Sequence, residues 1–342
     1  MSLVVGVIFP PKKIARLQEV LTVDRDDIRF ILIDLEDLTP TKRLISNLEL
    51  EAATERFAAQ YGLLDALLHK LSHEMVFEGM GDFGAVNRVK LVQNYLQHHP
   101  SVCVVDPFDS VRLLTDRHAA CKLLQSMEHS ETPATQRFKV PKFFEANCPE
   151  QFQTLLKDLN TGRTFLAAKA NLFSAATERS HMMSVITKLD DLQYDGYPTL
   201  YQEFINHSGR LFKGYVLGNA IDVAERRSLP NLVAGTAQHV RFNTQQNYPT
   251  SEDFHPHVDL KILESRLDDK YSQQNVFAAV RAIGKRLREE LNLTLFGFDV
   301  ILADDGSCDL YVIDINYFPS YRELADFSTI LRTHIKQLCG RQ

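Results

Sequence analysis

The stretch that decides the fold is residues 295–318, LFGFDVILADDGSCDLYVIDINYF. It predicts two apolar strands, Leu295–Leu302 and Leu310–Phe318, joined by a polar turn around Gly306. Residues two apart on a strand share a face, and folding about the turn brings the first strand opposite the second. Three oxygen-bearing side chains therefore meet between the strands: Asp299, Asp314 and Asn316.

These side chains have the chemistry of a magnesium site. Two carboxylates and an amide oxygen suit magnesium, which takes hard oxygen ligands and is often completed by substrate phosphates. The alternative is a pair of carboxylates that simply face solvent from ordinary strands. The spacing is 14 residues between Asp299 and Asp314 and one between Asp314 and Asn316. Because that pattern lies inside apolar strands, it favours the metal site.

Composition and charge describe an ordinary globular chain. Its 342 residues suffice for two or three domains, and its 44% hydrophobic and 24% charged content is typical of an enzyme. The net charge of −6 gives no reason to expect a nucleic-acid partner. An anionic ligand would therefore have to meet a local basic cluster.

The cysteines and the start of the chain bear on the compartment. The five cysteines are scattered and lack C-x-x-C spacing, which indicates a reduced compartment without structural zinc. No apolar run approaches the roughly 18 residues of a membrane span. The first charges follow the first apolar stretch, which is the wrong order for a signal peptide. We expect a cytoplasmic protein without a membrane partner, and we expect it to be a monomer.

Strands and helices alternate along the chain, which predicts an α/β protein whose first third is an open domain with a largely parallel sheet. The strands expected there are Leu3–Phe9, Phe30–Ile33, Ala66–His69 and Val102–Val105. Helices are expected at Asn87–His99, Arg112–Glu128, Pro149–Leu159 and Gln274–Leu291. After the expected helix Arg112–Glu128 comes a linker rich in Thr and Pro at 131–141. A long polar connection runs through 243–256. The expected domains are 1–112, 113–204 and 205–342.

Basic residues in or at the ends of apolar strands are the second chemical signal. Lys169 ends the strand FLAAK before a loop of small and hydroxyl-bearing residues, where it can hold nucleotide phosphates or simply face water. Lys213 lies within RLFKGYVLG and Arg226 within AERRSL. A single cation in an apolar strand calls for a partner, either a phosphate or a buried carboxylate. The segment 201–205, YQEFI, can present backbone groups to an adenine edge.

Taken in order along the chain, these motifs resemble the inositol-1,3,4-trisphosphate 5/6-kinase family, whose members also act as inositol-tetrakisphosphate 1-kinases. The resemblance runs from Val5 to about Phe327 and implies the ATP-grasp fold, in which two α+β domains enclose the nucleotide. GFD…DxN alone would indicate only ATP-grasp, and HKL and LLTDR narrow it to the inositol-phosphate kinases. The motifs are Lys13 after the first strand, HKL with Lys70, LLTDR with Arg117, Lys169, Ser180-His181, QEFINH, LFKGYV, ERRSLPN, GFD and DINYFP.

The resemblance implies a role for each matching residue and two kinds of cofactor, ATP and magnesium, with two ions expected. The residues implied to contact ATP are Arg117, Lys169, Gln202, Glu203, Ile205 and Ser228. Those implied to bind an inositol polyphosphate are Lys13, Lys70, His181, Lys213, Asn316 and Ser320. Magnesium would be held by Asp299, Asp314 and Asn316. Arg226 would add positive charge near the transferring phosphoryl group, and His181 is the candidate general base, although phosphate binding suits it better.

One loop departs from the family pattern. Family members carry a His-Gly pair after the ATP lysine, whereas residues 170–181 here, ANLFSAATERSH, have no glycine and no histidine before His181. Glycine lets a backbone approach phosphate closely. We therefore expect the segment 173–179 to act as a lid that sets specificity, with Arg179 reaching the phosphates or else pairing with Glu178.

Three functions remain open at this point. The first is an ATP-dependent inositol polyphosphate kinase, in which catalysis is positioning and charge neutralisation. The second is an ATP-grasp carboxylate–amine ligase, against which Lys13 and Lys70 argue because a ligase has no need of phosphate clamps there. The third is a catalytically weak inositol-phosphate binder. The altered loop favours it, and the intact acid set opposes it.

Overall fold

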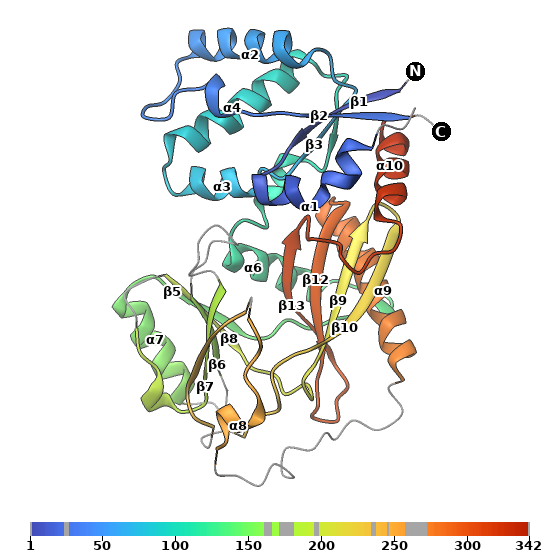
Figure 1. The fold of residues 1–342 in the computed structure, drawn as a ribbon. Coiled ribbons are helices and arrows are strands. Elements are labelled where there is room, and N and C mark those ends of the chain that lie inside the picture. Colours follow the sequence, from blue (N-terminus) through green and yellow to red (C-terminus); the bar gives the residue numbers. More distant parts are fainter. Residues whose placement is uncertain are drawn as a thin grey trace.

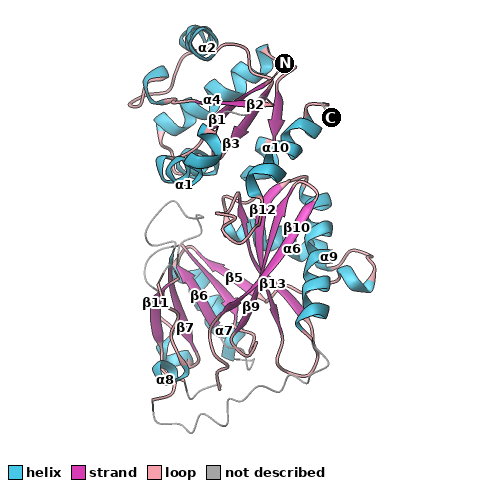
Figure 2. Cartoon of the chain, turned by 45° about the vertical axis from the view of Figure 1, so that its right-hand side comes forward, coloured by secondary structure: helices cyan, strands magenta, loops and turns pink. Residues whose placement is uncertain are grey.

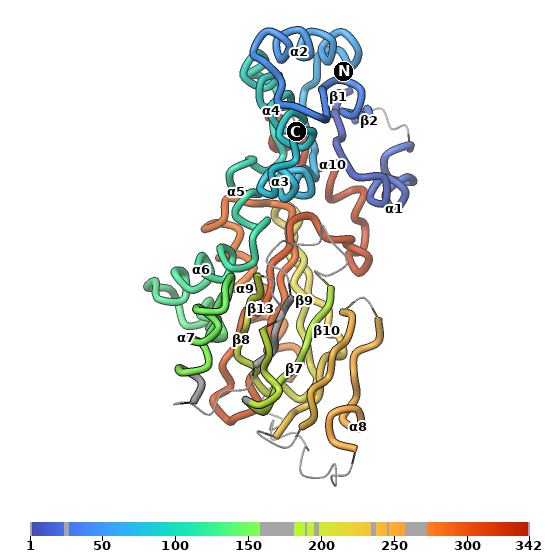
Figure 3. Tube along the Cα trace, turned by 90° about the vertical axis from the view of Figure 1, so that its left-hand side faces the viewer, coloured from blue at the N-terminus to red at the C-terminus, as the bar shows by residue number. Residues whose placement is uncertain are grey.

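The computed structural model of the protein describes residues 2–23, 27–160, 166–170, 181–194, 198–233, 237–244, 246–256 and 272–340. These residues build three sheets with helices packed on them (Figure 1). The molecule is elongated, and the unit around the first sheet occupies one end (Figure 3). No helix in these ranges is long and apolar enough to cross a membrane. The expected loop 173–179, with Arg179, lies outside the described residues.

The first sheet is parallel, as expected, with strand order β2-β1-β3-β4. Its strands are β1 (Leu3–Ile8), β2 (Ile28–Leu32), β3 (Ala66–His69) and β4 (Cys103–Val105). The helices around it are α1 (Pro11–Thr22), α2 (Asn47–Tyr61), α3 (Ser72–Gly79) and α4 (Phe83–His98). Helix α4 begins four residues before the expected Asn87, because the Asp82 carboxylate accepts a hydrogen bond from Ala85 N at 2.7 Å and caps it.

The expected helix Arg112–Glu128 is in fact two helices, α5 (Phe108–Arg112) and α6 (Arg117–Glu128). Asp116 is extended and accepts a hydrogen bond from Ala119 N at 2.7 Å, so it starts a new helix and interrupts the old one. The sequence analysis also missed several elements. These are α2, α3, β5 (Phe143–Ala146), β11 (Val240–Asn243), α8 (Ser251–Phe254) and α10 (Phe327–Leu338).

The third sheet, β10-β9-β12-β13, is antiparallel and carries the expected hairpin. Its strands are β9 (Arg210–Leu217), β10 (Ala220–Arg227), β12 (Leu295–Leu302) and β13 (Leu310–Tyr317), and α9 (Gln273–Leu291) packs on it. The ring of Phe298 fills the space between sheet and helix. A Cβ at Gly214 would lie 2.3 Å from that ring, and one at Gly284 of α9 would lie 2.9 Å from it. Glycine at both positions therefore permits the close packing.

The central sheet has the order β11-β7-β6-β8-β5. Its other elements are β6 (Leu166–Ala170), β7 (Met182–Ile186), β8 (Thr199–Glu203) and helix α7 (Pro149–Asn160). Strand β11 pairs with β7 although it lies beyond residue 205, and α10 lies against the first sheet (Figures 1 and 2). The sheets thus draw on segments that are distant in sequence, and the expected domain limits remain predictions.

One hydrophobic cluster runs through the first and third sheets, from Leu3 to Ile335. Helix α10 joins these sheets through Arg332, whose side chain is only 2% exposed. Its guanidinium donates to the Asp27 carboxylate at 2.9 Å and to the carbonyl of Val23 at 2.9 Å. Because a buried guanidinium must be hydrogen-bonded to be tolerated, this contact fixes the helix against the first sheet.

Candidate functional site

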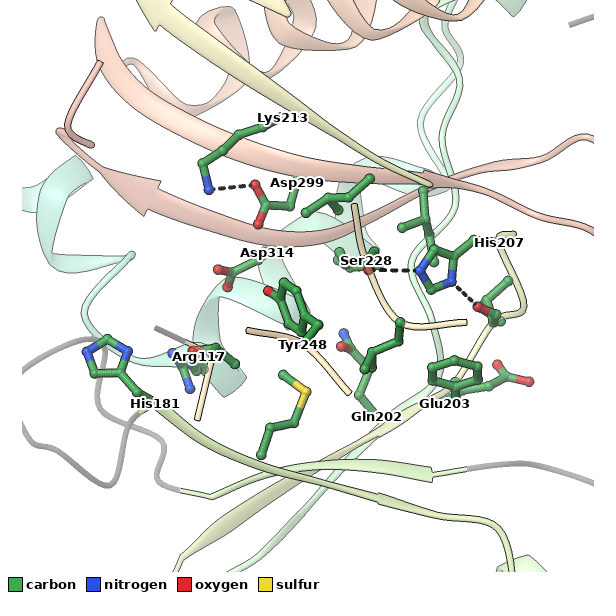
Figure 4. Close-up of a pocket in the computed structure, with 18 of the residues that line it drawn as sticks. Arg117, His181, Gln202, Glu203, His207, Lys213, Ser228, Tyr248, Asp299 and Asp314 are labelled. Atoms are coloured by element: carbon green, nitrogen blue, oxygen red, sulfur yellow. Dashed lines mark hydrogen bonds and ion pairs between the residues drawn. The ribbon is translucent and has the colours of Figure 1, made fainter. Parts of the chain in front are cut away.

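A cavity of about 310 Å³ opens between the third sheet and the central sheet (Figure 4). Most of the residues that the sequence analysis assigned to ATP, magnesium or substrate line it. They are Arg117, His181, Gln202, Glu203, Ile205, Lys213, Ser228, Asp299, Asp314 and Asn316. Residues separated by up to 199 positions in the chain (316 − 117 = 199) therefore meet at one place.

The acidic wall of the cavity comes from the hairpin. Asp299 of β12 lies opposite Asp314 of β13, in the register that the sequence predicted, and a β-bulge follows Asp299. A bulge re-aims the neighbouring side chains, a device common beside functional sites. The Asn316 amide donates to the Asp314 carboxylate, with Nδ2 and Oδ2 2.6 Å apart.

Lys213 of β9 is the cation beside these acids. It faces Asp299 across the β9–β12 pair, and its Nζ lies 2.9 Å from Asp299 Oδ1 (Figure 4). Burial alone would lower the pKa of Lys213, but the charges of Asp299 and then Asp314 outweigh burial and raise it. Of the two partners that the sequence left open, phosphate or carboxylate, this structure therefore has the carboxylate.

The acid set fits a metal that shares its coordination sphere with a ligand. In the ranges that the structure describes, no group of three or more His, Cys, Asp or Glu side chains could hold a metal ion alone. Asp299, Asp314 and Asn316 supply two carboxylates and an amide oxygen on the wall of a cavity. That donor set suits magnesium completed by phosphate oxygens.

The cavity also has an apolar lining, which suits a flat heteroaromatic ring. Its apolar lining comprises Met183, Phe204, Leu211, Leu229, Ile301 and Ile313. Gln202 of β8 is 4% exposed, and its Nε2 has no hydrogen-bond partner among the described residues. A buried amide without a partner costs about 1–3 kcal/mol. A ligand edge that accepts a hydrogen bond would remove that cost.

Two further residues of the cavity were not assigned from the sequence. His207 bonds through Nε2 to Ser228 Oγ at 2.9 Å and through Nδ1 to Ile205 O at 2.7 Å, and burial lowers its pKa. It thus holds two ligand-lining segments together. The QEFINH motif contained this histidine, but nothing local marked its partner 21 positions on. Tyr248 lies in what was expected to be only a polar connection, and no sequence signal marks it.

His181 and Arg117 lie close together at one side of the cavity (Figure 4). Burial lowers the pKa of His181, and the charges of Arg117 and Lys12 lower it further. The lowered pKa favours the neutral imidazole, which can accept as well as donate a hydrogen bond. Arg117 is the first residue of α6, directly after the Asp116 cap.

Lys13 and Lys70 lie outside this cavity and converge on the turn that leaves β13. Lys13 Nζ donates to Pro319 O at 2.5 Å and Phe318 O at 3.3 Å, and Lys70 Nζ donates to Phe318 O at 2.9 Å. Burial and then the neighbouring cations lower the pKa of Lys13 to about 6 and that of Lys70 to about 8. Lys13 is buried and Lys70 half-buried, and neither forms an ion pair with a carboxylate among the described residues. Two such lysines on one carbonyl favour an anion beside them. Ser320 follows this turn.

Arg226, another assigned residue, is not among the described residues that line the cavity. Arg226 forms an ion pair with Glu323 in the segment after β13 and also approaches Tyr215 OH at 3.4 Å. Its partner in this structure is therefore also a carboxylate. Lys169 occupies β6, where its backbone pairs with Met183 and Leu200, and its side chain lies outside the described part of the chain.

Comparison with known proteins decides the family. The model of the inositol 1,3,4-trisphosphate 5/6-kinase ATP-grasp domain matches residues 132–337. The chain belongs to this family. It is 30% identical over 284 residues to the inositol-tetrakisphosphate 1-kinase of Xenopus laevis, covering 82% of this chain and 69% of that protein. It is 31% identical over 281 residues to the inositol-tetrakisphosphate 1-kinase 1 of Zea mays, covering 80% and 75%.

Solved structures agree on the fold. An ATP-grasp ligase, PsnB, in complex with a minimal precursor superposes with a TM-score of 0.55 at 14% identity, covering 99% of this chain and 100% of that one. At that identity the likeness shows only the fold. The expected ATP-grasp fold and the resemblance to the family are thus confirmed. The family match also supports the kinase assignment over the ligase, making the protein an inositol polyphosphate kinase, a phosphotransferase that uses ATP.

Proposed function

We propose that this protein transfers the γ-phosphoryl group of magnesium-bound ATP to a hydroxyl of an inositol tris- or tetrakisphosphate. The observation that carries the proposal is that two carboxylates, an apolar lining and the cations Arg117 and Lys213 all border one cavity. The relatives named inositol-tetrakisphosphate 1-kinases support the same substrate class. We also propose that the protein is cytoplasmic and monomeric.

In this proposal the nucleotide occupies the cavity lined by both sheets. The adenine ring would lie against the apolar lining, with Gln202, Glu203 and Ile205 along its edge. Support comes from the buried Gln202 amide, which has no hydrogen-bond partner among the described residues. Ser228, held by His207, would contact the nucleotide. Arg117 and Lys169 would bind its phosphates, because guanidinium and ammonium groups match phosphate oxygens.

Asp299, Asp314 and Asn316 would hold two magnesium ions, which supply charge neutralisation on the β- and γ-phosphates when bound. Their position on the cavity wall supports this assignment. Lys213 is held charged by Asp299 and would contact a substrate phosphate from there. Lys213 thus keeps positive charge beside Asp299 and Asp314, and this charge would attract the inositol phosphate in spite of the two carboxylates.

The inositol phosphate would lie between the cavity and the turn after β13. Lys13 and Lys70 would clamp its phosphates, together with Lys213, His181, Asn316 and Ser320. Arg226 would exchange Glu323 for the transferring phosphoryl group. Reaction would then need only an aligned hydroxyl and phosphoryl group, since phosphoryl transfer proceeds by positioning and charge stabilisation. His181, whose lowered pKa favours the neutral imidazole, could take the hydroxyl proton or bind a phosphate.

The test is incubation of the purified protein with magnesium-ATP and a panel of inositol tris-, tetrakis- and pentakisphosphates, with products separated by anion exchange. A new inositol phosphate carrying one more phosphate is expected for at least one tris- or tetrakisphosphate. Absence of product from every inositol phosphate, with ATP hydrolysis dependent on an added amine and carboxylate, would replace the kinase by a ligase. The Asp314→Asn protein serves as the inactive control.

A further inference from the structure

Two cysteines that lie far apart in the sequence meet at the amino-terminal edge of the first sheet. Cys103 begins β4, and Cys339 follows the last residue of α10. They are 236 positions apart (339 − 103 = 236). The Cys103 backbone N–H donates to Asp65 O at 3.0 Å, and the Cys339 thiol lies 4.0 Å from the same oxygen. Both cysteines therefore lie beside the backbone carbonyl of Asp65.

Burial raises the pKa of the Cys103 thiol, and a side-chain hydrogen bond with Cys339 lowers it in part, which is consistent with two neighbouring thiols. Helix α10, which ends one residue before Cys339, lies against β4, which begins at Cys103. The proposed bond needs the Cα atoms of the two cysteines about 4.4–6.8 Å apart. Both residues pack on the edge of the main hydrophobic cluster and are half-buried, so that a small reagent can reach them.

The other cysteines have different surroundings. Cys308 bonds to Gly306 O of its own turn at 3.5 Å. Cys121 is buried beside Leu200. Cys148 precedes helix α7 in the central unit. The thiol contact between Cys103 and Cys339 thus gives this pair a chemistry that the composition alone did not suggest.

We propose that Cys103 and Cys339 form a reversible disulfide that ties the end of α10 to the first sheet when low-molecular-weight disulfides accumulate. The oxidant is a disulfide of the glutathione type. The Cys339 thiol loses its proton and attacks one sulfur, which expels one glutathione thiolate and leaves a mixed disulfide. The Cys103 thiol loses its proton and displaces the second glutathione thiolate. One disulfide is reduced and one is formed, so electrons balance.

The surroundings of the two cysteines bear on their reactivity and on what the bond would join. Burial raises the pKa of the Cys103 thiol, and its hydrogen bond with Cys339 offsets only part of that rise. A thiol of this kind is a poor nucleophile until a partner disulfide is held beside it. The cross-link would join the unit that carries Lys13 and Lys70 to the helix that follows the Phe318–Pro319 turn, which those lysines hold.

The test equilibrates the full-length protein in buffers of increasing oxidised-to-reduced glutathione ratio, blocks free thiols and maps peptides by mass spectrometry. The expected result is a Cys103–Cys339 peptide pair lacking two hydrogens, which disappears when the reduced ratio is restored. Unfolding temperature should rise by several degrees on oxidation, because the bond closes a long loop of the unfolded chain.

Variants separate the bond from general oxidation. Cys148→Ser should keep both the peptide pair and the rise in unfolding temperature, whereas Cys339→Ser and Cys103→Ser should each abolish both. Should one of these two serines unfold the protein, peptide mapping of the unaltered chain still decides. Lasting glutathione adducts on Cys103 or Cys339 without a joined peptide pair would overturn the proposal, as would an equal temperature rise in Cys339→Ser.

Discussion

The first and third sheets differ from the central sheet in how they are held together. The first two share one continuous hydrophobic cluster, and Arg332 of α10 fastens them at a second place. Among the described residues, the buried side chains of the central sheet fall into three small clusters of their own. Stability rises with contiguous buried apolar area, so the central unit should open at lower free energy than the rest.

The candidate site has residues on both of these parts of the molecule. Asp299, Asp314 and Lys213 stand on the large core, which keeps the acids and their cation in fixed register. Gln202 and His181 stand on or beside the central sheet. We therefore expect the acids to be preorganised and the wall that carries Gln202 and His181 to be the more mobile one. Preorganised charge is the form of stabilisation that contributes most to catalysis.

The largest expected effect comes from breaking the rigid wall. Asp314→Asn should lower phosphoryl transfer by about a thousandfold, equivalent to about 4 kcal/mol of transition-state stabilisation. The fold should survive, because Asn keeps an oxygen that can accept the hydrogen bond from the Asn316 amide. Steady-state kinetics and circular dichroism would measure the two effects. Asp305→Asn, an exposed substitution in the same hairpin turn, is the matched control, and near-normal turnover by folded Asp314→Asn would refute the metal-site assignment.

The next effect tests how α10 is fastened to the large core. Arg332→Met should lower the free energy of unfolding by about 3 kcal/mol, because it leaves the Asp27 carboxylate and several carbonyls without their buried donor. Lys336→Met is the control, since Lys336 Nζ lies 3.3 Å from the same carboxylate but is 32% exposed and should contribute less than about 1 kcal/mol. Denaturant unfolding of both variants measures the difference. Equal losses would mean that α10 is not fastened through Arg332.

The third effect concerns the lysines at the edge of the large core. Lys13→Ala and Lys70→Ala should each weaken inositol-phosphate binding about ten- to a hundredfold, since a charge-assisted contact contributes about 1.5–3 kcal/mol. ATP affinity should change little, and Lys90→Ala, an exposed lysine of α4, should change neither. Calorimetry that gives unaltered inositol-phosphate affinity for both variants would leave these lysines with a purely structural role on the Phe318 carbonyl.

The same lysines make a prediction about pH. Their pKa values are lowered to about 6 and about 8 in this structure. A bound polyanion favours the charged form of each lysine and therefore raises both pKa values. Binding of the inositol phosphate then takes up protons at any pH between the pKa of a lysine in the free protein and its pKa in the complex. Affinity should therefore fall as pH rises from about 7.5 to about 9.5, a window in which the ligand phosphates are already ionised. Proton uptake measured in buffers of different ionisation enthalpy should shrink in Lys13→Ala, and an unchanged uptake would contradict the assignment.

The smallest effect would sharpen the comparison itself. Amide hydrogens of β7 and β8 should exchange faster than those of β9 and β12, by an opening free energy lower by on the order of 1 kcal/mol. A non-hydrolysable ATP analogue with magnesium should slow exchange in β7 and β8 and leave β9 almost unaffected. Hydrogen-exchange mass spectrometry resolves both. Uniform protection in all four strands without nucleotide would show that the separate small clusters do not weaken the central unit.

In the third sheet, the local sequence pattern was enough to predict the hairpin. The strand bounds at Leu295–Leu302 match the structure, and Asp299 lies opposite Asp314 as the position of the turn required. Alternation with period two is a property of neighbouring residues, so it can be read without the fold. Helix starts were less readable. Asp82 and Asp116 act as caps only because their side chains turn back on the next residues.

Elements stabilised by distant partners escaped the sequence. Strand β11 has four residues and exists as an edge of the central sheet because β7 lies beside it. Helix α10 has no side-chain cap, and its packing against the first sheet holds it. Short segments such as these have weak local preference, so tertiary contact decides their conformation.

The sequence by itself determined the kinds of side chain, their order and their faces on each strand, and hence the family and the chemistry of the cavity. Only the tertiary structure decided which partner each takes: Asp299 for Lys213, Glu323 for Arg226, and Cys339 for Cys103. Local periodicity follows from backbone geometry over a few residues. Partners far apart in sequence are set by how whole sheets and helices pack, and that depends on the entire chain at once.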